Sequence, residues 1–266
     1  MKPPAEMLNA HNISISFGGL KAVQAFSLAI PAGGLYGLIG PNGAGKTTVF
    51  NLLTGVYPTH SGHIHVDGRR VDGLKPHKIA DAGLARTFQN IRLFGELTVI
   101  DNVRLGCHVR GQHSLFTTIL RTPGHVGQER AITQRSLELL SIFKLDDRGD
   151  EQARNLPYGD QRRLEIARAL ATEPKVLLLD EPAAGMNSQE KVELRDMIRN
   201  IRDRFGLTIL LIEHDMGVVM DVCERITVLD YGQIIAVGSP KEIQANEAVI
   251  EAYLGTPTEL PDGAEV

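Results

Sequence analysis

The chain has 266 residues, enough to bury a substantial core in one large domain or two subdomains. Its formal net charge of −4 provides no overall positive field that would attract nucleic acid or anionic lipid. Its longest apolar runs, such as residues 176–179 and 209–212, are far below the roughly twenty residues of a membrane helix, and residues 1–6 lack a signal-peptide pattern, so we expect a soluble cytosolic chain.

Short β-like runs open the chain. Residues 13–17 and 26–30 are separated by a Gly18-Gly19 turn, and residues 63–66 and 69–71 flank an Asp67-Gly68 turn. These runs predict a small antiparallel sheet near the N-terminus.

A glycine-rich loop lies between these two strand pairs. It reads Gly40-Pro41-Asn42-Gly43-Ala44-Gly45-Lys46-Thr47 and fits the phosphate-binding template G-x-x-x-x-G-K-[ST] at every fixed position. A buried strand is predicted before it at 35–39 and a helix after it at 47–54. Glycines let backbone N–H groups curve around phosphate oxygens, Lys46 can reach the β- and γ-phosphates, and the Thr47 hydroxyl can bind magnesium. The sequence therefore predicts a nucleoside triphosphate binder.

The second half of the chain alternates between strands and helices. Residues 101–147 have a mostly helical pattern, and then come a strand at 176–179, a helix at 189–205 and a strand at 208–213. Apolar strands with intervening helices predict a parallel sheet covered on both faces. The expected fold class is α/β, with the helical stretch inserted into the core.

Two carboxylates follow the predicted strand at 176–179, at the sheet edge where open parallel sheets bind ligands. Neighbouring strand residues point in opposite directions, so Asp180 and Glu181 are expected to have different roles. Asp180 is suited to organise magnesium through water, and Glu181 to polarise a water that attacks the γ-phosphate. The alternative is a strand that simply ends in solvated acids.

Two further features point to phosphate chemistry. His214 follows the strand at 208–213, at the same sheet edge, where it can stabilise charge at the γ-phosphate; a structural histidine is the alternative. Gly159 lies just before a helical pattern at 162–170 and can expose backbone donors to a second phosphate, although an ordinary helix start would look the same. Two such helix ends suggest that nucleotide is shared between two chains.

Taken in this order, the motifs resemble the ATP-binding cassette (ABC) family over residues 8–255. The resemblance implies that the phosphates are held by Gly40, Pro41, Asn42, Gly43, Ala44, Gly45, Lys46, Thr47 and Thr48. It also implies that Gln89 joins Thr47 and Asp180 around magnesium, that Glu181 is the catalytic base and that His214 is the switch histidine. Phe17 would stack on adenine, with packing inside the small sheet as the alternative. Tyr158, Gly159 and Asp160 would form the signature turn, which acts on the nucleotide of a partner chain.

The same resemblance predicts how the domain is organised. It implies a P-loop NTPase core with a parallel sheet, a small N-terminal antiparallel β subdomain and an inserted α-helical subdomain. The core and β subdomain would take up residues 8–90 and 172–240, the helical subdomain 91–171, and a flexible tail 256–266.

Three residues depart from the family pattern. Pro157 replaces the usual signature serine and removes its hydroxyl, and Asp160 would place an acid near the partner's γ-phosphate. Asn187 stands where an aspartate is common; it can still form hydrogen bonds but carries no charge.

Within the family, residues 83–94, 158–163, 181–185, 212–216 and 249–255 resemble the longer ATPase subunit of branched-chain amino acid uptake systems. An insertion at 114–123 looks similar and would place Leu115, Phe116, Ile119 and Leu120 on one helical face, against a membrane partner or against its own subdomain. The resemblance implies an importer ATPase that uses ATP and Mg²⁺ on the inner face of the cell membrane. Its partners would be a related second ATPase subunit or a second copy, two permease subunits and, indirectly, a periplasmic solute-binding protein, with no nucleic acid.

Other functions remain open on the sequence. They are a soluble ABC-family ATPase outside transport and an importer for another small solute, such as urea or amides. A kinase or GTPase built on the same loop is disfavoured, because the chain has no Asn-Lys-x-Asp motif and Glu181 beside Asp180 suits attack by water better than phosphoryl transfer to a second substrate. His60, His63 and His65 invite a metal site, but a solvated turn accounts for them. The two cysteines, Cys107 and Cys223, are far apart and suit reduced thiols.

Overall fold

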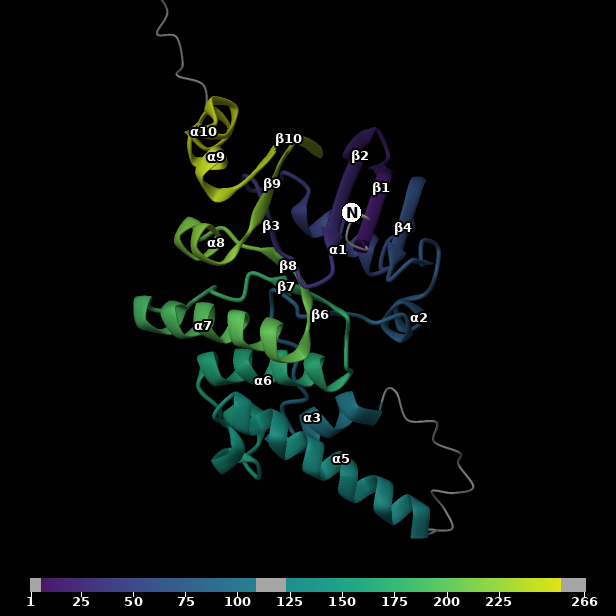
Figure 1. Cartoon of the computed structure of the whole chain (residues 1–266), viewed down its shortest axis with the longest axis vertical. Helices are drawn as coiled ribbons and strands as arrows, with labels where there is room; N and C mark the ends of the chain where they lie inside the picture. The colour runs from purple at the N-terminus through teal and green to yellow at the C-terminus, as the bar shows by residue number, and fades with distance from the viewer. Residues whose placement is uncertain (1–5, 109–122, 255–266) are drawn as a thin grey trace, which may run out of the picture.

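The computed structural model describes residues 6–108 and 123–254 (Figure 1). An antiparallel sheet, with strand order β2-β1-β4-β5, forms the N-terminal part of the fold. Its strands are β1 (Glu6–Phe17), β2 (Leu20–Pro31), β4 (Ser61–Val66) and β5 (Arg69–Arg70). The predicted antiparallel sheet is confirmed, although β1 and β2 are much longer than the runs at 13–17 and 26–30.

The central sheet has six strands in the order β10-β9-β3-β8-β7-β6. They are β3 (Leu35–Ile39), β6 (Leu84–Arg86), β7 (Val176–Asp180), β8 (Thr208–Ile212), β9 (Arg225–Asp230) and β10 (Gln233–Gly238). Only the β9–β10 pair is antiparallel. Because β3, β7 and β8 are parallel neighbours, the segments that follow them meet at one edge of the sheet.

Alternation along the central strands fills two separate cores. In β7, Leu177 and Leu179 belong to one buried cluster, whereas Val176 and Leu178 belong to the other. The first cluster includes the helices that cover one face, and the second joins the other face to the antiparallel sheet. Such burial on both faces explains why these strands are almost entirely apolar.

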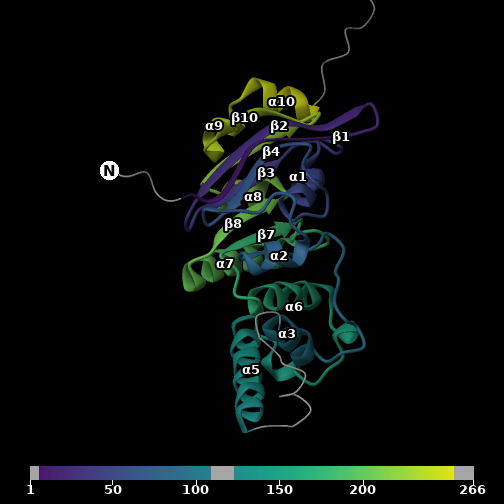
Figure 2. The same ribbon diagram turned by 90° about the vertical axis from the view of Figure 1, so that its right-hand side faces the viewer.

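Three of the described helices form a separate group at one end of the molecule. The described helices are α1 (Lys46–Leu53), α2 (Pro76–Asp81), α3 (Val99–His108), α5 (Pro123–Ile142), α6 (Tyr158–Ala171), α7 (Ser188–Phe205), α8 (Met216–Val222), α9 (Pro240–Gln244) and α10 (Glu247–Leu254), with 3₁₀ turns η1 (Asp146–Arg148) and η2 (Ala153–Asn155). Helices α3, α5 and α6 pack on one another at the end of the molecule away from the antiparallel sheet (Figure 2). None of the helices in the described ranges is long and apolar enough to cross a bilayer.

Some predictions reach beyond what the structure describes. The apolar face at Leu115, Phe116, Ile119 and Leu120 lies outside the described residues, as does the tail at 256–266. The proposed subdomain boundaries remain predictions, although an α-helical group does lie between β6 and β7 in chain order.

Helix α6 begins earlier than the pattern at 162–170 indicated. Its first residue is Tyr158 and its N-cap is Pro157, so Gly159 lies inside the first turn and not ahead of the helix. Proline fixes its own φ and has no N–H to leave unpaired, which suits the entry to a helix. The predicted signature residues therefore form the helix N-terminus itself.

The N-terminus of α7 is capped by Asn187, which accepts hydrogen bonds from the backbone N–H groups of Gln189 at 2.9 Å and Glu190 at 3.0 Å. Glu190 in turn accepts from the Asn187 N–H at 2.8 Å, completing a capping box. We expect Asn187→Ala to lower the free energy of unfolding by about 1 kcal/mol, measured by urea denaturation.

Asn187→Asp is the matched control for this cap. Aspartate accepts the same two bonds and adds a negative charge at the positive end of the helix dipole, so stability should equal or exceed that of the parent. An aspartate variant as unstable as the alanine variant would contradict the capping role.

Candidate functional site

The loop at 40–47 needs glycine at two positions because its backbone lies directly against neighbouring strands. A Cβ on Gly40 would lie 2.0 Å from the Leu229 carbonyl oxygen. Gly45 has a φ of 106°, and its Cβ would lie 2.7 Å from the Ala22 carbonyl oxygen. Glycine at these two positions therefore allows the loop to pack closely against the strands, which a residue with a side chain would prevent.

Helix α1 presents its N-terminus to this loop. It begins at Lys46, one residue before the predicted start, and among the described residues no side chain caps it. Its first turn carries no acidic residue. Unpaired N–H groups and the positive end of the helix dipole therefore face the loop, and this arrangement fits a phosphate group.

The ammonium group of Lys46 lies within the loop. Its Nζ donates to the carbonyl oxygens of Gly40 at 2.7 Å and Pro41 at 2.9 Å. Burial lowers the pKa of Lys46, while the nearby charges of Glu181 and Asp180 act in the opposite direction. A cation held between loop and carboxylates is well placed to neutralise a polyphosphate.

Asp180, the last residue of β7, is buried and ion-paired. Its carboxylate accepts from Arg86 Nη2 at 2.7 Å, and the same guanidinium donates through Nη1 to Asn51 Oδ1 at 2.7 Å. Burial raises the pKa of Asp180, and Arg86 partly offsets this effect. The predicted magnesium role of Asp180 stays a prediction, and Arg86 is a partner that sequence reasoning missed.

Glu181 has an unusual backbone. The strand ends at Asp180, and Glu181 adopts a φ of 47°, which is rare for a residue with a side chain. The alternation argument was therefore wrong in its reason, although the two carboxylates do separate. A strained backbone of this kind is typical of functional positions, because surrounding contacts must hold it in place.

Two predicted catalytic residues, Gln89 and His214, converge on one carboxylate oxygen of a third, Glu181. Gln89 Nε2 donates to Glu181 Oε2 at 2.9 Å, and His214 Nδ1 lies 3.6 Å from the same oxygen. Gln89 and His214 are exposed, whereas Glu181 is half-buried. They arise from three separate segments of the chain, so their meeting is a product of the fold. Gln89, a weak signal in isolation, proves to be a direct neighbour of the acid pair.

Glu213 is a buried residue next to His214 that connects the two loops of this group. Sequence reasoning did not identify its role. It is fully buried, and burial raises its pKa, an effect that its hydrogen bonds oppose. Its carboxylate accepts the Ala183 N–H at 2.6 Å and the N–H groups of His214 at 3.1 Å and Asp215 at 3.3 Å. The loops after β7 and β8 are thus fixed to each other.

The signature turn lies at the start of α6. Tyr158 is exposed, and Gly159 and Asp160 are half-buried. Asp160 pairs with Arg148 at 2.9 Å and with Arg163 at 3.5 Å. These two arginines offset the negative charge that Asp160 would otherwise present to a phosphate.

Phe17 lies at the end of β1, in the hairpin whose Ala22 carbonyl touches Gly45. The residue is 45% exposed, and its ring packs edge-on against Tyr57, with centroids 5.2 Å apart. The structure shows the packing alternative, and the stacking of Phe17 on adenine stays a prediction.

The remaining candidates from the sequence lie elsewhere. His63 Nδ1 lies 3.7 Å from Asp72, and His60 Nδ1 accepts the Ser16 N–H at 3.4 Å. Within the described ranges, no three His, Cys, Asp or Glu side chains are placed to hold a metal ion. Cys107 and Cys223 are both free thiols.

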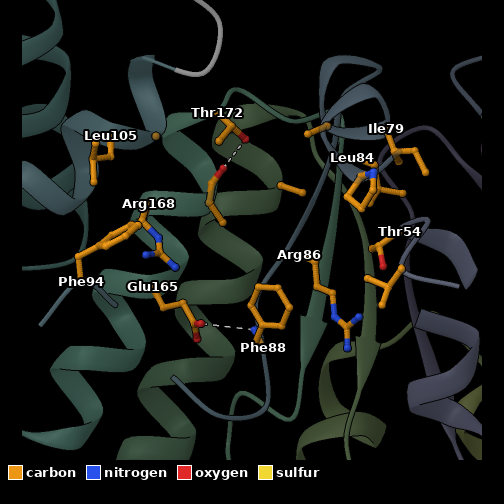
Figure 3. Close-up of a pocket in the computed structure, with 16 residues that line it drawn as sticks. Thr54, Ile79, Leu84, Arg86, Phe88, Phe94, Leu105, Glu165, Arg168 and Thr172 are labelled. Carbon is orange, nitrogen blue, oxygen red and sulfur yellow. Dashed lines mark hydrogen bonds between the residues drawn. The ribbon is translucent and has the colours of Figure 1, made fainter. Parts of the chain in front are cut away.

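An apolar groove lies between the central sheet and α3 and α6. It encloses about 520 Å³. Its lining includes Val56, Ile79, Leu84, Phe88, Phe94, Leu105 and the polar residues Arg86, Glu165 and Arg168 (Figure 3). Phe88 immediately precedes Gln89, so the groove and the contact between Gln89 and Glu181 share one loop.

A parallel sheet, a glycine-rich loop before a helix and a carboxylate next to that loop define a P-loop nucleoside triphosphatase. The family model described as ABC transporter matches residues 23–184, more than half of the chain. A second model, described as branched-chain amino acid ATP-binding cassette transporter, matches residues 233–258. The chain belongs to the ABC transporter family; it binds ATP and is an ATPase.

Several relatives match nearly the whole chain. The high-affinity branched-chain amino acid transport ATP-binding protein LivG of Salmonella typhimurium is 46% identical over 94% of this chain and 98% of its own length. BraF of Pseudomonas aeruginosa, of the same description, is 42% identical with the same coverage. LptB of Escherichia coli, a lipopolysaccharide export ATP-binding protein, is 35% identical over 93% of this chain and 97% of its own.

The fold matches solved ATP-binding cassettes. The crystal structure of the ADP conformation of an ABC transporter cassette aligns with a TM-score of 0.82 at 30% identity, covering 94% of this chain and 99% of that one. A nucleotide-free cassette gives the same TM-score at 29% identity. The P-loop α/β fold predicted from the sequence is confirmed.

Proposed function

We propose that this chain is the ATPase subunit of an importer for branched-chain amino acids. The observation that carries the proposal is the convergence of Gln89, Glu181 and His214 beside a complete phosphate loop, in a chain that matches LivG over almost its entire length. The match of the C-terminal segment to the branched-chain family model favours this solute over the export function named for LptB.

In this proposal, residues 40–48 hold the ATP phosphates and Phe17 stacks on adenine. The glycine backbone and the uncapped N-terminus of α1 support this assignment, because both suit a polyanion. Lys46 would exchange its two loop carbonyl partners for β- and γ-phosphate oxygens. Its position between loop and acid pair supports that exchange.

Magnesium fits the same site. Thr47 is exposed beside the loop, the amide oxygen of Gln89 is a hard ligand, and Asp180 lies behind them to act through water. A bound Mg²⁺ would neutralise charge on the β- and γ-phosphates. Glu181 would accept a proton from the attacking water, and His214 would stabilise charge on the γ-phosphate.

We further propose that two ATPase subunits close head to tail, so that Tyr158, Gly159 and Asp160 of each face the nucleotide of the other. The exposed N-terminus of α6 and the pairing of Asp160 with Arg148 and Arg163 support this role. The partner would be a related second subunit, with a homodimer as the alternative.

The permease partner would dock in the groove between the central sheet and α3 and α6. Its apolar lining suits the apolar face of a short helix, and exposed Phe94 and Leu105 stand at its wall. Because Phe88 lines the groove and Gln89 follows it in the same loop, a displacement of the docked helix would move Gln89 relative to the Glu181 carboxylate. The chain would then lie peripherally on the inner face of the membrane, with a periplasmic solute-binding protein supplying the solute.

Uptake in the organism that carries this chain tests the proposal. Deleting its coding sequence should abolish high-affinity uptake of labelled leucine, isoleucine and valine; the parent gene should restore it, and a Glu181→Gln allele should not. Labelled proline is the control solute, and labelled urea and acetamide test the other importer reading. Unchanged leucine uptake in the deletion strain would refute the proposed solute.

A further inference from the structure

We infer that the buried pair Arg162–Glu165 on α6 is a positioning device that holds Gln89 against Glu181. The inference rests on the proposed catalytic roles of Gln89 and Glu181. Neither Arg162 nor Glu165 belongs to the motifs that mark the phosphate loop, acid pair or switch histidine. Both are within the interior: their side chains are 0% and 1% exposed.

The pair binds the backbone of the Gln89 loop at four points. Arg162 Nη1 donates to the Phe88 carbonyl at 2.6 Å, and Nη2 donates to the Gln89 carbonyl at 2.7 Å. Glu165 Oε1 lies within reach of the Phe88 N–H at 3.4 Å and the Arg92 N–H at 3.3 Å. Arg162 and Glu165 are themselves joined at 2.9 Å. Together they hold the backbone of Gln89 and of the residues before and after it.

The same guanidinium reaches the signature turn. Arg162 Nη2 also donates to the Tyr158 hydroxyl at 3.1 Å. The Tyr158 ring lies against the loop after the acid pair, because a Cβ on Gly185 would be only 3.3 Å from it. A single arginine therefore contacts the Gln89 loop and, through Tyr158, the segment that follows Glu181.

Stability alone does not account for a pair in this position. Burying two charges is expensive, and apolar residues of similar size often replace such pairs with no loss of stability. What apolar residues cannot replace is the fork of donors that binds two adjacent carbonyls. The pair therefore fixes the geometry of the loop, and this geometry maintains the 2.9 Å contact between Gln89 and Glu181.

The test is a double-mutant cycle on the full chain, measured by steady-state ATP hydrolysis and thermal unfolding. The pair is replaced by Arg162→Met with Glu165→Met, in the parent and in a Gln89→Ala background. Arg202→Met with Glu224→Met is the control, since it removes a more exposed ion pair, of 2.8 Å, that does not contact the Gln89 loop. We expect kcat to fall about tenfold or more in the parent background with KM for MgATP kept within about threefold, because only positioning is lost.

In the Gln89→Ala background the pair replacement should cause no further loss, since the amide it positions is gone. The control pair should leave kcat unchanged in both backgrounds. Equal losses in both backgrounds, or a folded variant with parental kcat, would overturn the inference. Gln89→Ala with parental kcat would also overturn it, and would remove the proposed role of Gln89 itself.

A second variant covers the case in which the double replacement fails to fold. Arg162→Lys keeps the charge but has one compact ammonium in place of the fork, so it cannot span both carbonyls in the same geometry. We expect a well-folded protein with an intermediate kcat and an unchanged KM for MgATP. Parental kcat in Arg162→Lys would also overturn the positioning role of the pair.

Discussion

Glu181→Gln is expected to lower kcat for ATP hydrolysis by more than about 10²-fold while ATP still binds, because the amide cannot take a proton from water. The substitution keeps the size of the side chain and an oxygen that can accept the Gln89 hydrogen bond of 2.9 Å. Single-turnover hydrolysis and equilibrium binding of a fluorescent ATP analogue, measured on the same preparation, separate the two effects.

Glu138→Gln on α5 is the matched control, since it makes the same change of charge at an exposed position of the helical group. It should leave both kcat and affinity unchanged. Turnover near the parental value in Glu181→Gln would assign the proton acceptor to another group, and His214, 3.6 Å from the same carboxylate oxygen, would be the next to test.

Lys46→Ala is expected to weaken MgATP binding by about 10²-fold or more, since it removes the cation that lies within the loop next to the acid pair. Two loop carbonyls would also lose their donor, so part of the effect would come from a looser loop. Isothermal titration with ATP and with ADP distinguishes the contributions, because loss of γ-phosphate contact affects ATP more.

Lys175→Ala is the control for this prediction. Lys175 precedes β7 at the opposite end of the strand from Asp180, and its ammonium pairs with Asp67. It removes the same charge without touching the loop, so the affinity for ATP should be retained. An unchanged ATP affinity in Lys46→Ala would refute the assignment of residues 40–48 as the phosphate site.

Local signals in the sequence predicted much of the fold. The phosphate loop, β3, β7 and β8 follow from residue patterns a few positions long, since glycine conformational freedom and burial on both faces act locally. Element boundaries were less predictable: α6 begins at Tyr158, four residues before the pattern that marked it, because a proline N-cap admits an earlier start.

Contacts between distant segments could not be read in the same way. The ion pair of Arg86 with Asp180 joins residues 94 positions apart, and nothing near either residue indicates the other. The backbone conformation of Glu181, with a φ of 47°, depends on the residues around it. The rule that successive strand residues point in opposite directions therefore did not apply there. Arg162 and Glu165 have the i, i+3 spacing of an ordinary exposed helix pair, and only the packed structure shows that both are buried.

The buried carboxylate of Glu213 has a mechanical consequence. It accepts hydrogen bonds from the backbone of both loops at the sheet edge beside Glu181, at Ala183 in one loop and at His214 and Asp215 in the other. A displacement of the backbone at His214 and Asp215 therefore strains these bonds unless the segment that follows Glu181 moves with it. If Glu181 and His214 act on the γ-phosphate as proposed, the two loops would respond to its departure as one unit and not separately.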